Sequence, residues 1–145
     1  MPESTDDDDL SRQAKRLKAR FFEAIWSGTE WLSADQIVQR AAGTGSAVSA
    51  VLLSKWEQER RLFGLEKAGV KVYPAYAFDS HFTPLPALAA VLGILGEGSP
   101  LGPAAFFEST SGFLEGRRPR EVLAQEPQRV IAKARDERDS QDYCG

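Results

Sequence analysis

Residues 107–123, FESTSGFLEGRRPREVL, decide the fold of the C-terminal half of this 145-residue chain. Gly116 readily takes a positive φ and can therefore end the preceding element at little cost. Pro119 suits the first position of a helix, where no backbone N–H is needed. Glu121 then falls in the first turn, where the helix dipole favours a negative charge. The stretch predicts a corner between two helical segments.

The segments on both sides of this corner also show helical patterns. Residues 85–95 are apolar on nearly every side, so we expect this helix to be central or shared with a second subunit in a homodimer, with Val91 or Leu95 at the contact. Residues 140–145 are expected to be a loose tail. The predicted helices of this small C-terminal bundle cover residues 85–95, 104–111, 119–125 and 127–139.

The N-terminal half begins with an amphipathic segment. Residues 10–27 carry apolar side chains at helical spacing, and the other side carries a basic stripe. Five of the residues from 1 to 9 are acidic and none is basic, so we expect a disordered acidic tail there. The stripe consists of Arg12, Lys15, Arg16, Lys18 and Arg20, and it either faces solvent or faces phosphates.

A helix-turn-helix pattern follows. Ser33 and Gln36 form a capping box that starts a helix over residues 34–42. Gly45 lies in the turn, and Ser46 is expected to cap a second helix that runs to about residue 60. The register of that helix predicts Val48, Val51, Leu52 and Trp56 on the buried side, and Ser49, Ala50, Leu53 and Glu57 on the outer side.

A short β-hairpin is predicted after the second helix. Residues 62–65 and 70–73 are extended in pattern and flank the turn Glu66-Lys67-Ala68-Gly69. The fold class is therefore mainly α, with a helix-turn-helix and a hairpin wing followed by the helical bundle. We expect a DNA-binding half over residues 10–79 and a second helical domain over residues 80–139.

The ordered set Leu114, Gly116, Pro119, Glu121 and Leu123 resembles the C-terminal toxin-binding domain of the Xre/MbcA/ParS-like antitoxins. Upstream, Tyr73, Pro74, Tyr76, Phe78 and Asp79 resemble the family segment that ends the DNA-binding half, although Ala77 replaces the usual Gln. Thr110-Ser111-Gly112 likewise stands where Pro-Asn is usual. The similarity covers about residues 31–134.

The resemblance implies a type II antitoxin that binds operator DNA and masks a cognate toxin, often a RES-domain protein that consumes NAD. The cofactor then belongs to the partner, and we expect no cofactor and no metal in this chain. Toxin and antitoxin commonly assemble as hetero-oligomers. Two alternatives stay open, namely a stand-alone transcriptional regulator and a protein-interaction module with a degenerate helix-turn-helix.

The chain has little material for catalysis. His81 is the one histidine and Cys144 the one cysteine, and they lie far apart in the sequence. A Cys–His or Ser–His pair and an intrachain disulfide are therefore not expected, and we predict a non-enzyme. The single cysteine and the absence of a signal-peptide pattern favour the cytoplasm. No apolar run is long enough to span a membrane.

Two sets of residues are the candidate sites. The second helix and the wing are expected to contact DNA, mainly at phosphates, because the predicted outer side lacks the Arg, Asn or Gln that usually reads bases. The arginines of the corner and the polar C-terminal helix are expected to contact the toxin. The DNA set is Ser46, Ser49, Lys55, Arg60, Arg61 and Lys67. The toxin set is Arg117, Arg118, Arg120, Arg135 and Asp139.

Overall fold

The computed structural model describes residues 2–96, 98, 101–110 and 112–144, and it is mainly helical with one small antiparallel sheet. The elements of the N-terminal half are α1 (Pro2–Gly28), β1 (Trp31–Ser33), α2 (Ala34–Gly43), α3 (Ala50–Gln58), β2 (Leu65–Lys67), β3 (Val70–Pro74) and the 3-10 turn η1 (Ala75–Ala77). Those of the C-terminal half are α4 (Pro86–Leu95), α5 (Leu101–Glu108), the 3-10 turn η2 (Gly112–Leu114), α6 (Pro119–Val122) and α7 (Pro127–Cys144).

The three strands form a sheet in the order β1-β3-β2. A hairpin is present, with Leu65 opposite Val72, but its turn is only residues 68 and 69, because Glu66 and Lys67 belong to β2 instead of to the predicted turn. No local pattern indicates β1, which pairs antiparallel with β3 so that Leu32 lies opposite Tyr73. A three-residue strand is too short to show an alternating pattern, and its pairing depends on a partner about forty residues away.

The capping box of α2 is confirmed. The backbone N–H of Ser33 donates to the Gln36 side chain at 2.8 Å, and the backbone N–H of Gln36 donates to the Ser33 hydroxyl at 3.3 Å. Ala41 is fully buried, and Gly45 has a φ of 81°, which suits a glycine in the turn. The first helix and the turn therefore form where the sequence predicted them.

The predicted start of α3 and the predicted placement of Val51 and Leu53 are wrong, whereas Val48 and Trp56 are buried as predicted. The N-cap is Ser49, whose hydroxyl accepts from the backbone N–H of Leu52, and Ser46 lies in the preceding turn. Leu53 is fully buried, whereas Val51 is 80% exposed. Two competing serine caps, three residues apart, offered two start points, and burial of Leu53 selects the later one.

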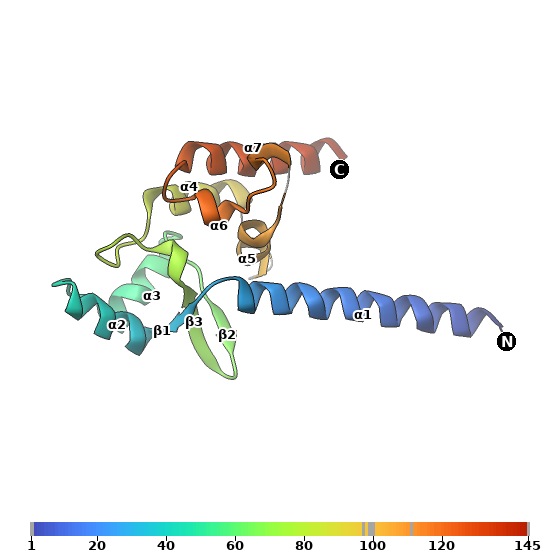
Figure 1. Cartoon of the computed structure of the whole chain (residues 1–145), viewed down its shortest axis with the longest axis horizontal. Coiled ribbons are helices and arrows are strands. Elements are labelled where there is room, and N and C mark those ends of the chain that lie inside the picture. Colours follow the sequence, from blue (N-terminus) through green and yellow to red (C-terminus); the bar gives the residue numbers. More distant parts are fainter. Residues whose placement is uncertain (1, 97, 99–100, 111, 145) are drawn as a thin grey trace.

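The C-terminal half packs α4 along α7, with α6 beside them (Figure 1). Val91 is fully buried in this packing, whereas Leu95, the other residue expected at a subunit contact, is partly exposed. The helix is apolar nearly all round because it lies among α5, α7 and the N-terminal half. Its neighbour α6 is a single turn and ends at Val122, earlier than predicted.

Both terminal helices are longer than the sequence predicted. α1 starts at Pro2 rather than at residue 10, so residues 2–9 are helical where a disordered tail was expected. Negative charges near the N-terminal end of a helix are stabilised by the helix dipole, and this stabilisation opposes the repulsion between the acidic side chains. α7 likewise continues to Cys144 instead of ending near residue 139. Residues 1 and 145 lie outside the described residues.

Aromatic side chains join the two halves of the chain. Phe63 stacks on Phe107 with ring centroids 6.0 Å apart, and Tyr76 lies 5.2 Å from the same Phe107 ring. Phe107 is fully buried and comes from α5, while the other two rings come from the N-terminal half. One continuous hydrophobic core therefore spans the boundary expected near residue 79, and α1 projects away from it (Figure 1).

Candidate nucleic-acid and partner interfaces

The exposed side of α3 is the candidate DNA-reading surface. Val51, Ser54, Lys55 and Gln58 are exposed and recur at helical spacing. Because Leu53 is buried, the outer side of α3 presents the polar side chains of Lys55 and Gln58 in place of that leucine. Gln and Lys can donate hydrogen bonds to base edges, and Val51 can contact a thymine methyl group. We call these four residues the α3 face.

The structure separates the predicted phosphate contacts into exposed and occupied groups. Lys55 is exposed, and it has no ion pair with any residue that the structure describes. The Arg61 guanidinium lies 5.9 Å from the Trp56 ring centroid and 3.7 Å from a Glu59 carboxylate oxygen. The amine of Lys67, in the hairpin, lies 5.2 Å from the Trp26 ring centroid. Lys55 is thus the most available cation of the set.

Arg60 has a structural role. Its Nη2 donates to the backbone oxygens of Leu92 at 2.8 Å and Gly96 at 2.9 Å, so its guanidinium contacts the C-terminal end of α4. The sequence predicted that Arg60, at the end of the second helix, contacts DNA phosphates together with Lys55 and Arg61. The contact lies 32 residues away in sequence, and no local signal indicates it.

The three arginines of the corner are paired within the chain. Arg120 donates a bidentate pair of hydrogen bonds to the Glu108 carboxylate, at 2.7 and 3.3 Å. The Arg118 side chain lies 3.1 Å from the same carboxylate. The Glu108 side chain is only 8% exposed. This pairing raises the pKa of Arg120 mainly through the hydrogen bond to Glu108. The carboxylate that offsets the clustered positive charges is therefore the chain's own.

Glu108 also abuts the end of α1. A Cβ placed on Gly28 would meet its carboxylate oxygens at 2.5 Å, so glycine permits the close approach. The phenol of Tyr76 is buried nearby, and burial together with the Glu108 charge raises its pKa. Gly28, Tyr76, Glu108, Arg118 and Arg120 form what we call the Glu108 cluster, which ties α1 and η1 to α5 and α6.

The third arginine of the corner, Arg117, belongs to a neighbouring network of ion pairs. Arg117 Nη1 donates to Glu126 at 2.7 Å, and Arg129 bridges Glu126 at 3.3 Å and Glu115 at 3.2 Å. These hydrogen bonds, with Arg117 first, lower the pKa of Glu126. Arg117 is partly exposed, with 38% of its side chain accessible to solvent.

The motif residues of the corner have structural roles. Leu114 is fully buried, Leu123 is 1% exposed, and Gly116 has a φ of 81°. Pro119 starts α6, and the Glu121 side chain accepts from the backbone N–H of Arg118 at 3.0 Å. The motif therefore defines how the corner folds. Arg135 and Asp139 of the predicted toxin set are exposed on α7.

An apolar groove runs between α4 on one side and the segment from the end of α6 into α7 on the other. Its volume is about 420 Å³, and its lining includes the exposed residues Ala90, Ala124 and Gln128. Leu85 and Ile131 form apolar parts of the lining. The sequence did not single out these residues, because a groove depends on how three helices pack. We call this feature the α4/α7 groove.

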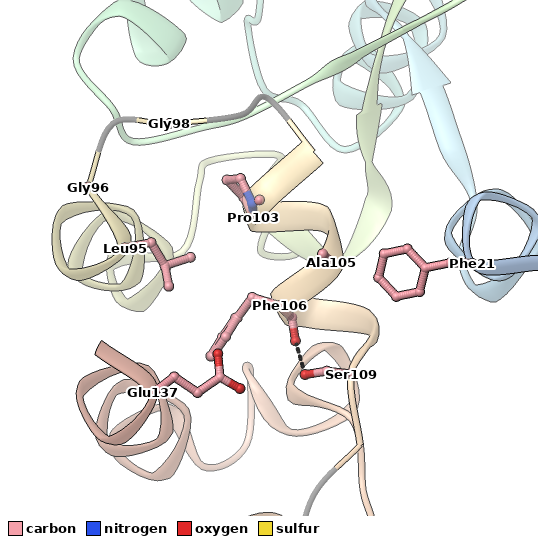
Figure 2. A pocket seen from close by; sticks show the side chains of 10 residues that line it. Phe21, Leu95, Gly96, Gly98, Pro103, Ala105, Phe106, Ser109 and Glu137 are labelled. Atoms are coloured by element: carbon pink, nitrogen blue, oxygen red, sulfur yellow. Dashed lines mark hydrogen bonds between the residues drawn. The ribbon is translucent and has the colours of Figure 1, made fainter. Parts of the chain in front are cut away.

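A second hollow lies between α1, the C-terminal end of α4, α5 and α7, with a volume of about 460 Å³ (Figure 2). Phe21 and Phe106 contribute apolar lining, and Ser109 and Glu137 contribute polar atoms. Beneath them, Lys133 is 1% exposed, and its amine donates to Ser109 at 3.1 Å and Glu137 at 2.5 Å and lies 4.7 Å from the Phe106 ring centroid. The buried lysine is therefore fully paired.

Comparison with known proteins adds no relationship: no family model matches the chain, and neither curated proteins nor solved structures give a significant match. Within the described part of the chain, every helix is too short or too polar to cross a membrane.

Proposed function

We propose that the chain is an antitoxin-like protein with a winged helix-turn-helix that contacts operator DNA and a C-terminal helical half that binds a toxin. The observation that carries the DNA-binding part is the order α1-β1-α2-α3-β2-β3 with sheet order β1-β3-β2, combined with the outward α3 face. A recognition helix that follows a short helix and a Gly turn is the usual way to enter a major groove.

DNA binding by this surface relies on few charges. The whole chain carries a net charge of −3, and Lys71 of the hairpin pairs with Glu57 at 2.9 Å. Lys55 and Gln58 are the polar groups best placed on the α3 face. We therefore propose salt-sensitive binding, with modest discrimination between sequences, that serves autoregulation.

The toxin-binding part is supported by the resemblance of residues 114–123 and by the α4/α7 groove beside them. The groove has a floor of core residues, among them Leu123 and Ile131, and the small residues Ala90 and Ala124 are exposed in its lining, which suits an apolar helix or loop of a partner. Arg117 pairs with Glu126, which directly precedes the groove residue Pro127, and can add a polar contact to a partner bound there. The resemblance suggests a RES-type toxin, whose NAD would be bound by the toxin.

Neutralisation in cells tests this proposal. Cells that co-express the neighbouring toxin-like gene should grow with the wild-type chain and stop growing with Ala90→Glu or Ala124→Glu, because a charge in the groove excludes an apolar partner. Gln125→Glu is the matched control, since Gln125 is exposed but does not line the groove. Circular dichroism checks that all variants are folded.

The outcomes separate the alternatives. Growth rescue by both groove variants would place the toxin contact elsewhere. Failure of the wild-type chain to rescue growth, together with specific operator binding, would identify a stand-alone regulator. Failure to bind any DNA at low salt, with a groove-dependent protein partner, would identify an interaction module.

A further inference from the structure

Helix α1 carries an apolar stripe that is largely exposed, although Phe21 at one end of the stripe also lines the hollow beside α5. Leu10 is 65% exposed, Leu17 is 66% exposed and Phe21 is 43% exposed, and Ala14 between them is also exposed. The intervals of four, three and four residues are those of a coiled-coil seam. A protruding helix gains stability mainly by packing its apolar side, so this stripe needs a partner.

The opposite side of α1 is basic. Arg12, Lys15 and Arg16 are exposed and project away from the seam, because they differ from Leu10 and Leu17 by intervals that place them across the helix. The body of the protein holds only the far end of α1, where Ile25 is 2% exposed and the helix contacts α5. The seam therefore faces solvent over at least two turns.

We propose that α1 pairs with α1 of a second copy of this chain in an antiparallel two-helix contact. Side-chain size supports this orientation, because Leu10 then lies opposite Phe21 of the second copy and Ala14 opposite Leu17, so that each Leu17 fills the space beside the small Ala14. A parallel pair would set Ala14 against Ala14 and leave a gap.

Charge supports the same orientation. Five of the residues from 3 to 9 are acidic, and a parallel pair would bring both acidic ends together. The antiparallel pair places these ends on opposite sides. The flanking positions then bring Lys18 near Ser11 and Gln13 near Arg20, so no like charges meet beside the seam, and the basic side of each copy stays outside.

Sedimentation velocity of the full chain over a range of concentrations tests the pairing. The wild-type chain should dimerise, and Leu10→Gln with Leu17→Gln should weaken dimerisation at least about 100-fold, because both large seam residues lose their apolar contact. Arg12→Gln with Arg16→Gln is the matched control on the opposite side and should remain dimeric. The thermal unfolding of each variant shows that its body is intact.

A distance measurement tests the orientation. A spin label at Ser27→Cys, in a Cys144→Ser background, should report about 35 Å between copies in the antiparallel pair, since the labelled positions lie about 23 helical residues apart along the axis. A parallel pair would give less than about 20 Å. A monomeric wild-type chain, a dimer that survives the seam variant, or the short distance would overturn the proposal.

Discussion

The guanidinium of Arg60 caps the C-terminal end of α4 by donating to the backbone oxygen of Leu92 at 2.8 Å. The last carbonyl groups of a helix have no partner within it, and a cation there also complements the helix dipole. Arg60 itself has a φ of 57°, a conformation that side-chain-bearing residues seldom adopt. The contact fixes the end of α3 against the end of α4 and so sets how the two halves meet.

Replacement of Arg60 by Ala should lower the free energy of unfolding by about 1.5–3 kcal/mol, the usual range for hydrogen bonds made by a charged group. Alanine keeps the same backbone restriction, so the change isolates the guanidinium. Urea unfolding measures the effect, with Arg61→Ala as the neighbouring control that should change stability by less than about 0.5 kcal/mol. If Arg60→Ala lowered the free energy of unfolding no more than Arg61→Ala does, the contact between Arg60 and the end of α4 would not contribute to stability.

Glu108→Gln should destabilise the protein by about 3 kcal/mol, because Arg120 would keep a charge in a position that is only 17% exposed. The substitution preserves shape and removes only the negative charge. Glu115→Gln, at a side chain that is 72% exposed, is the control and should be nearly neutral. Thermal unfolding followed by circular dichroism compares the two, and a neutral Glu108→Gln would show that solvent already compensates Arg120.

Lys55→Ala should weaken DNA binding to a similar extent on all duplexes and reduce the slope of log affinity against log salt by about one unit. Combining it with Arg61→Ala should lower the slope by less than a second full unit, because Arg61 is partly engaged with Trp56 and Glu59. Fluorescence anisotropy at several salt concentrations provides the measurement. An unchanged slope for Lys55→Ala would remove α3 from the phosphate-contacting surface.

Val51→Asp should abolish DNA binding without unfolding the protein. Val51 is 80% exposed, so the core does not lose a side chain, while a negative charge is added to the α3 face. Leu53→Asp is the contrasting variant. Because Leu53 is fully buried, an aspartate at this position should prevent folding. A folded Leu53→Asp variant and an unfolded Val51→Asp variant would restore the register predicted from the sequence.

The Glu126 carboxylate should contribute to stability only above the acid range. Hydrogen bonds from Arg117 and Arg129 hold its pKa below the ordinary value of 4.5. A lowered pKa means that the stabilisation is fully present above about 4.5 and is lost as the pH falls through the folded-state pKa. Urea midpoints of the wild-type chain and Glu126→Gln should therefore differ at about pH 7 and converge toward about pH 3. A difference that is independent of pH would contradict this linkage.

Local patterns determined those elements whose signals lie within a few residues. The Ser33 capping box, the Gly45 turn and the α6 start at Pro119 depend on backbone preferences and nearby side chains, and they form as predicted. The hairpin also forms, but its turn is two residues shorter than predicted. The basic stripe of α1 was also evident, since helical periodicity alone places it.

Tertiary structure decided what depends on distant partners. Burial of Leu53 chose between two serine caps, and pairing with β3 created the short strand β1. Arg60 and Arg120 looked like free cations in sequence, yet their partners, Leu92 and Glu108, lie 32 and 12 residues away. Charge and local pattern indicate where a side chain can go, but only packing determines which carbonyl or carboxylate is near enough to bind it. The sequence alone therefore determined the elements and their caps, and the fold determined which charged groups remain for a partner.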